Sequence, residues 1–170
     1  MTRFALAAFA AMLAAGTVRA ESVTIPARIL EPAWKAADCD QPLKNEPRDA
    51  YDLGGNLKLV ELPCWLAAYQ AGSIFVVFDP ALPERVRLLK FEQLGDKGFV
   101  REASLTMPSF DPKTKTLRSM HKGRGLGDCG TLGTWRWTGA DFKLTGFWNK
   151  ENCDGRPFRA EKRWQVFPKR

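Results

Sequence analysis

Hydrophobic and polar side chains alternate with a period of two from Asn56 onward, which is the pattern of β-strands with one buried face. The alternation is clearest over residues 57–62 and 85–91. Residues 73–78 form an unbroken β-branched and aromatic run, which is typical of a strand buried on both faces. Glycine and proline turns separate these segments, so the pattern predicts many short strands.

The second half of the chain continues this pattern. Residues 133–137 and 141–148 flank a turn at 138–140 and predict a β-hairpin. Further strands are expected at 99–106, 114–120 and 160–167, which gives about eight or nine in all. The connections are too short for crossover helices, so the strands must pair mostly antiparallel. We therefore expect an all-β fold: an antiparallel sandwich, a barrel or a strongly curved sheet.

Residues 21–55 lack this alternation and are rich in proline and charge. We expect an irregular segment there, with a helical turn or two over 33–38 that places Pro32 at the first helical position. Nothing in the composition marks a linker, so residues 21–170 are expected to form one β-rich domain.

The first twenty residues predict a secretory signal peptide. A basic start leads into an apolar run from Phe4 to Ala15, and the small residues Val18 and Ala20 suit a cleavage site after Ala20. The run is shorter than the ~20 residues that a membrane-spanning helix needs, and no other segment is apolar enough. We expect a periplasmic or secreted protein with no membrane span.

Charge and composition narrow the function classes. Removal of the signal peptide takes away two arginines and lowers the formal net charge from +7 to +5, which is mild and gives no indication of nucleic-acid binding. Hydrophobic residues make up 45% and charged residues 26%, as in ordinary globular proteins. A single histidine excludes a His-rich metal site, and the sequence implies no metal and no cofactor.

Four cysteines in an exported chain indicate disulfides, and their spacing lacks the close Cys-x-x-Cys pairs of metal sites. Cys39 and Cys64 lie 25 residues apart in one half of the chain, and Cys129 and Cys153 lie 24 apart in the other. Four cysteines allow three pairings, and we expect the local one, Cys39–Cys64 with Cys129–Cys153.

A glycine-rich segment gives the chain its most distinctive motif. Residues 119–130 read Ser-Met-His-Lys-Gly-Arg-Gly-Leu-Gly-Asp-Cys-Gly, and the hairpin motif Trp-x-Trp-x-Gly-x-x-Phe-x-Leu follows at 135–144. With Leu-Pro-Cys-Trp at 62–65 and Asn-Cys-Asp-Gly at 152–155, the chain resembles the bacterial envelope family known as domain of unknown function 1176. The resemblance covers about residues 39–167. It implies export and paired cysteines, and it implies no activity.

The glycine-rich segment has two interpretations. Lys122 and Arg124, with the backbone amides near Gly125 and Gly127, would form a cradle for an anion such as phosphate or carboxylate. In the simpler interpretation the segment is a tight corner in which Asp128 bonds the amides of its own loop. The simpler interpretation is favoured, and the five residues remain the candidate binding site.

Two catalytic arrangements are weighed and disfavoured. His121 is the single candidate base, with Ser119 and Asp128 nearby in the sequence, yet no Gly-x-Ser-x-Gly elbow is present. Carboxylate pairs of the glycosidase kind are the other option, although aspartates beside disulfides commonly cap turns. The aspartates that lie within two residues of a cysteine are Asp38, Asp40, Asp128 and Asp154.

The aromatic residues and the basic end of the chain admit further interpretations. Trp135 and Trp137 share a strand face and either stack on a sugar or, as we expect, fill the core. Phe147 falls on the face opposite Phe142, so it is expected to be the exposed ring. The basic residues of 156–170 suit an anionic surface or a solvated edge strand.

We therefore expect a non-enzymatic exported module that binds an unknown envelope protein or an anionic polymer. One version is an inhibitor that presents a rigid loop to an envelope hydrolase, although the positive charge would repel basic lysozymes. The alternative is an envelope hydrolase that uses His121 or a pair of aspartates.

Overall fold

The structure, a computed structural model, describes residues 20–169. The expected signal peptide therefore lies outside the described residues except for Ala20. The elements, in chain order, are β1 (Glu21–Val23), α1 (Ala27–Ala36), β2 (Arg48–Gly54), β3 (Leu57–Leu66), β4 (Ala71–Asp79), β5 (Leu82–Leu88), β6 (Phe91–Gly95), β7 (Gly98–Glu102), β8 (Ser104–Thr106), β9 (Ser109–Asp111), β10 (Thr116–Lys122), β11 (Gly130–Trp137), β12 (Phe142–Lys150), the 3₁₀ turn η1 (Lys162–Trp164) and β13 (Gln165–Phe167).

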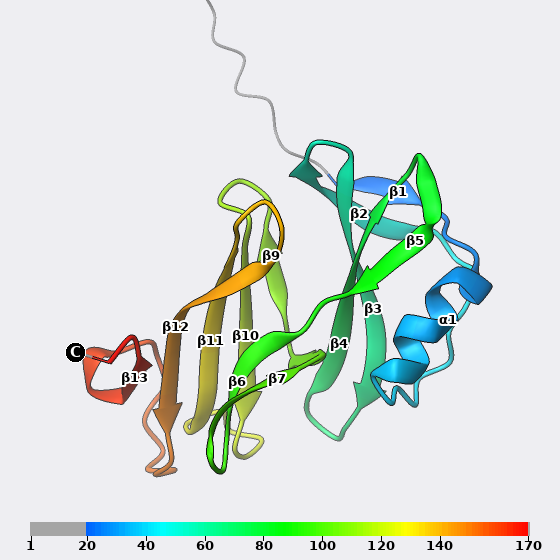
Figure 1. Cartoon of the computed structure of the whole chain (residues 1–170). Coiled ribbons are helices and arrows are strands. Elements are labelled where there is room, and N and C mark those ends of the chain that lie inside the picture. Colours follow the sequence, from blue (N-terminus) through cyan, green and yellow to red (C-terminus); the bar gives the residue numbers. More distant parts are fainter. Residues whose placement is uncertain (1–19, 170) are drawn as a thin grey trace, which may run out of the picture.

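These strands form two antiparallel sheets that face each other, with α1 on the outer side of the first (Figure 1). The first sheet has the order β1-β2-β3-β4-β5. Strand β8 also pairs directly with β4, outside this order. The second sheet has the order β13-β12-β11-β10-β9. The hairpin β6–β7 forms a separate two-stranded sheet between them. Of the three expected architectures, the structure is an open sandwich with no closed barrel.

One hydrophobic core fills the space between the sheets. It is formed by the inward-facing residues of the strands, which alternate along each strand as the period-two pattern requires. Its buried members are Leu53, Leu59, Phe75, Val77, Leu89, Phe91, Leu105, Leu117, Trp135, Trp137, Phe142 and Phe147. Trp135 and Trp137 are 1% and 7% exposed, so the expectation that they fill the core is confirmed.

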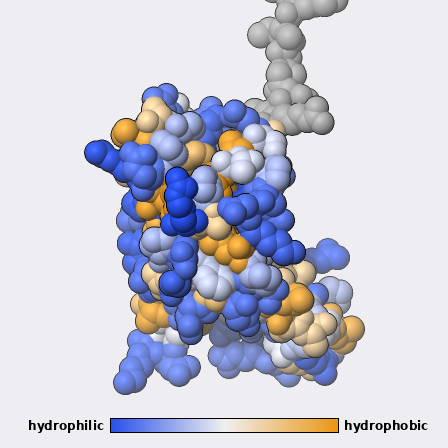
Figure 2. All heavy atoms as spheres, turned by 90° about the vertical axis from the view of Figure 1, so that its right-hand side faces the viewer, coloured by the Kyte–Doolittle hydropathy of each residue, from blue (hydrophilic) through white to orange (hydrophobic). Residues whose placement is uncertain are grey.

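A second core lies between the first sheet and α1. Its buried members are Ile25, Leu30, Ala33, Cys39, Ala50, Val60, Leu62, Cys64, Ile74, Val76 and Phe78. Strand β4 contributes to both cores, because its odd residues Phe75 and Val77 face the second sheet while its even residues face the helix. This two-sided burial explains its unbroken hydrophobic sequence. The surface over α1 is largely hydrophilic, with small hydrophobic patches between the polar residues (Figure 2).

The N-terminal region differs from expectation. Residues 21–55, expected to be irregular, contain β1, α1 and β2. The helix runs from Ala27 to Ala36 and begins after Pro26, so the expectation of a helix that starts at Pro32 was wrong. Asn45 Oδ1 accepts the Ala27 N–H at 2.7 Å, which satisfies one of the free donors of the first turn. Pro32 lies inside the helix. The helix is stabilised nevertheless, because Leu30 and Ala33 are buried against the first sheet.

The strands are also shorter and more numerous than expected. The segment 99–106 divides at Ala103 into β7 and β8, which join different sheets. The segment 85–91 likewise divides between β5 and β6. The closing strand expected at 160–167 is reduced to β13, which pairs with β12 at the edge of the second sheet.

Phe147 is 3% exposed, so the expectation that it is the exposed ring was wrong. The reason is a β-bulge in β12. Trp135 pairs with Leu144 whereas Thr134 pairs with Gly146, which leaves Thr145 as an extra residue. One extra residue inverts the alternation beyond it, so Phe147 returns to the core face.

No helix within residues 20–169 has both the length and the apolar character that crossing a bilayer requires.

Candidate functional site

The glycine-rich loop that joins β10 to β11 is fixed by a disulfide and an ion pair. Cys129 and Cys153 are bonded, which ties the loop to the segment after β12. The bridge Cys39–Cys64 in the other half ties the segment after α1 to β3. The structure thus contains the two local bridges expected from the sequence.

Within this loop, Arg124 and Asp128 form a two-pronged ion pair. Arg124 Nε and Nη2 donate to the two carboxylate oxygens of Asp128 at 2.8 and 2.6 Å. Asp128 is 1% exposed and also accepts the Gly155 N–H at 2.6 Å. The guanidinium of Arg124 and then the Gly155 amide hold the pKa of Asp128 far below its usual range. The anion that Arg124 of this loop binds in the structure is the carboxylate of Asp128, which belongs to the loop itself.

The same loop is attached to the turn between β3 and β4. The backbone N–H of Lys122 donates to Gln70 Oε1 at 3.0 Å. Gly125 packs beside the ring of Tyr69, because a Cβ at this glycine would lie 3.7 Å from Tyr69 Cδ1. The turn closes through the Ala67 N–H, which donates to the Gln70 carbonyl at 2.9 Å. Loops from the two sheets therefore form one surface at this end of the sandwich.

Large hydrophobic side chains are exposed on this surface. We call Leu66, Tyr69, Met107 and Leu126 the apolar rim; they are 67%, 46%, 41% and 70% exposed. Met107 belongs to it because its N–H donates to the carbonyl of Ala71, the residue that pairs with Leu66. The rim holds four of the seven large hydrophobic residues that are exposed within residues 20–169. Such a concentration is typical of a surface that meets a partner.

Three of the four glycines of the loop are required, for different reasons. Gly127 and Gly130 adopt φ of +68° and +129°, which residues with a side chain rarely adopt. A Cβ at Gly123 would lie 2.9 Å from Cys129 Sγ. Gly125 is the exception, since its φ is ordinary and its surroundings leave room for a side chain. The sequence did not distinguish Gly125 from the other three.

The residues of the candidate catalytic arrangement form contacts with other residues in the structure. His121 Nδ1 lies 3.3 Å from Thr106 Oγ1. The hydroxyl of Ser119 donates to the Thr106 carbonyl at 2.8 Å and is buried. The carboxylate of Asp128 is bound by Arg124. The structure therefore gives His121 a threonine neighbour in place of a serine or a carboxylate.

The aspartates near the other cysteines serve local structure. Asp154 accepts a hydrogen bond from Lys150 Nζ at 2.6 Å, and Lys150 is 2% exposed. That bond and the Arg156 N–H keep the pKa of Asp154 low. Asp38 adopts a φ of +54° at the end of α1, and Asp40 accepts a hydrogen bond from Gln41.

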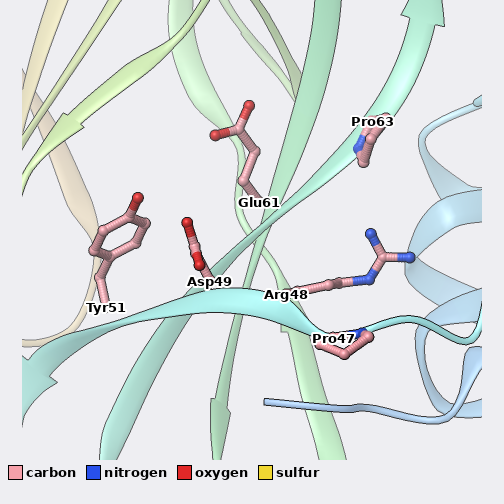
Figure 3. Close-up of a pocket in the computed structure, with 6 residues that line it drawn as sticks. All are labelled: Pro47, Arg48, Asp49, Tyr51, Glu61 and Pro63. Carbon is pink, nitrogen blue, oxygen red and sulfur yellow. The ribbon is translucent and has the colours of Figure 1, made fainter. Parts of the chain in front are cut away.

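Sequence reasoning missed a hollow of about 370 Å³ beside the first half of β2 and the middle of β3. In Figure 3 the polar ends of Asp49, Tyr51 and Glu61 point to one side of it, and Arg48 points to the other. Burial raises the pKa of Glu61, and a hydrogen bond from Ser73 opposes that shift. Burial and then the charges of Asp49 and Glu61 raise the pKa of Tyr51. The sequence feature that could have indicated this hollow is Glu61, which falls on the same strand face as Leu57 and Leu59.

The chain matches known proteins as follows. The family described as "Protein of unknown function (DUF1176)" matches residues 6–167. The chain is 40% identical over 97 residues to YpfG, an uncharacterized protein of Escherichia coli (strain K12). The match covers 56% of this chain and 28% of the relative, so the chain spans well under two thirds of that protein's length. No solved structure matches the chain.

Proposed function

Because the chain belongs to the DUF1176 family, whose description assigns no activity, we propose a function from the site itself: an exported, non-enzymatic module that binds an acidic protein through the apolar rim. The observation that carries this proposal is the exposure of Leu66, at the end of β3, and of Leu126, on the glycine-rich loop, at 67% and 70%. Exposed leucines on a mobile loop would lose entropy on binding. These two leucines are already positioned, so less of that cost remains.

Three kinds of contact fix the rim. The disulfide at Cys129 anchors one end of the glycine-rich loop, and the Arg124–Asp128 ion pair closes its middle. The hydrogen bond from Lys122 N–H to Gln70 joins the loop to the opposite turn. Together they support a preformed surface of the kind that protein inhibitors present to their targets.

Charge favours an acidic partner, and the ion pair argues against an anionic polymer as the main ligand. The chain is basic, so an acidic protein would be attracted to it. Within the loop, Asp128 neutralises Arg124. The other cation at this loop, Lys122, has no ion-pair partner among residues 20–169. A polymer site built on repeated phosphate or carboxylate contacts would need several free cations at this position. The candidate anion site of Lys122 and Arg124 is therefore proposed only as an electrostatic contribution to protein binding.

The proposal is tested by capture of proteins from an envelope extract with tagged mature chain and three variants. Leu66→Asp and Leu126→Asp place a charge on the rim, whereas Leu82→Asp changes an exposed leucine on β5. We expect one acidic protein to be retained by the wild type and by Leu82→Asp and to be lost from both rim variants. Retention by all three variants, or a captured protein that is basic, would contradict the proposal. Melting temperatures near that of the wild type establish that the rim variants are folded.

A further inference from the structure

A second hollow, of about 320 Å³, lies between the two sheets and is bordered by β3, β6, β7, β8, β10, β11 and β12. We propose that it binds an amino sugar unit, a pyranose ring that carries a protonated amine. This site goes beyond the proposed protein-binding function and stands independently of the apolar rim. The volume falls at the lower end of the range for ligand pockets, about 300–1,000 Å³, which suits a ligand of a few rings at most.

The aromatic wall is the half-buried indole of Trp65, whose position is built into the fold. Trp65 pairs with Gly72 on β4, and a Cβ at Gly72 would lie 2.0 Å from the indole ring. The absence of a side chain there therefore lets the ring lie against the sheet. Its Nε1–H donates to Ser104 Oγ at 2.7 Å. An indole held by Gly72 and by the hydrogen bond of its Nε1–H offers a fixed flat surface for the C–H face of a sugar ring.

Besides Leu94 and Phe147, the rest of the lining consists of polar groups that suit hydroxyls. Gln93 Nε2 donates to the Ser104 carbonyl at 2.8 Å, which positions the side chain while its amide oxygen keeps acceptor capacity. His121 and Thr106 lie 3.3 Å apart, and both offer donors and acceptors. Thr131 adds a further hydroxyl. A sugar needs many directional partners of this kind around one apolar face.

The charge of the lining selects an amine. Glu102 contributes a carboxylate, and neither arginine nor lysine is among the lining residues. A phosphorylated or carboxylated sugar would be repelled by Glu102, and no arginine or lysine of the lining would offset that repulsion. A protonated amine would instead be attracted by Glu102 and also by the π face of Trp65, since indole is the best ring for binding a cation. Carboxylate, indole and hydroxyls thus fit one ligand class.

The test is titration of the mature protein with a β-1,4-linked glucosamine tetramer, followed by tryptophan fluorescence and calorimetry. The fully N-acetylated tetramer lacks the charge, and a galacturonate tetramer carries the opposite charge. We expect the glucosamine tetramer to bind and the galacturonate tetramer to show no binding. Binding of the N-acetylated tetramer should be at least tenfold weaker. Absence of glucosamine binding, or tighter binding of either comparison sugar, would overturn the proposal.

Variants connect the binding to this hollow. Glu102→Gln removes the carboxylate from an exposed side chain, and we expect it to weaken glucosamine binding at least tenfold while leaving the N-acetylated sugar unaffected. Glu84→Gln, on β5, is the matched control and should bind like the wild type. Trp65→Phe should also weaken binding. Its melting temperature, measured in parallel, shows whether the variant is folded. Undiminished binding by Glu102→Gln would overturn the assignment. Leu126→Asp should bind sugar normally, so failure of the rim proposal and failure of this one are distinguishable.

Discussion

Gly130→Ala tests whether the glycine-rich corner is determined by its backbone. Gly130 has a φ of +129° and pairs with Lys122 where β11 begins. A Cβ there would lie 2.0 Å from the His121 carbonyl oxygen and 2.8 Å from Gly123 N. Both neighbours are backbone atoms, so no side-chain rotation relieves the contact, and the pairing of β10 with β11 must open at this end.

The magnitude follows from two contributions. An unfavourable φ costs about 1–3 kcal/mol, and forcing extra volume into a packed position costs about another 1–3 kcal/mol. We therefore expect the free energy of unfolding to fall by about 2–6 kcal/mol. For a domain of this size each kcal/mol corresponds to about 2–4 °C, so the melting temperature should fall by about 4–24 °C.

Gly139→Ala is the matched control. Gly139 also has a positive φ, +95°, in the turn after β11, but a Cβ there would meet nothing within 4 Å. Its cost should be limited to the φ contribution, about 1–3 kcal/mol. Calorimetry or circular dichroism melts of both variants separate the two contributions. If Gly130→Ala melts at the same temperature as Gly139→Ala, the steric argument for this corner is wrong.

Arg124→Ala should lower the melting temperature more than Lys122→Ala does, because it leaves Asp128 buried without its guanidinium; equal melting temperatures would contradict this. Asp128 has a lowered pKa in the folded state, so its stabilisation is present above its unfolded pKa of about 4 and is lost as pH falls toward the folded value. Asp128→Asn should therefore flatten the loss of stability between about pH 4 and pH 2 in acid titrations of the melting temperature. Glu61 has a raised pKa, so its ionisation destabilises the fold above that pKa; Glu61→Gln should melt higher than the wild type at pH 7 and equally near pH 4. Peptide mapping without reduction should recover both disulfides within their own halves of the chain, and a peptide that joins the halves would refute this pairing.

The sequence predicted the parts of the fold in which the hydrophobic pattern is strong and local. The run at 73–78 is the centre of β4, and the hairpin of β11 and β12 lies where its turn residues indicated. The sequence missed β2, because Arg48 and Asp49 begin a strand that owes its buried positions to neighbouring elements. Phe147 was misplaced because a bulge adds one residue without any mark in the pattern.

The candidate site was predicted in outline only. The sequence indicated that the glycine-rich segment is a corner, but not that the Asp128 carboxylate also accepts the amide of Gly155, which lies after β12. The apolar rim was not foreseen, because Tyr69 and Leu126 are 57 positions apart and only the packing of the two sheets brings their loops together. The indole of Trp65 depends in the same way on Gly72 and Ser104, which local patterns do not connect.

The two-sided burial of β4 has a consequence for how this protein opens. Exchange of backbone amide hydrogens with solvent requires a strand to separate from its neighbours, and β4 has β3 on one side and β5 and β8 on the other. Separating β4 would also expose its side chains on both the helix face and the face toward the second sheet. Its amides should therefore exchange only through global unfolding, whereas those of the edge strands exchange by local fraying. The slowest amides of β4 should thus report the full free energy of unfolding, and the helix layer and the second sheet should lose protection together with it at high denaturant.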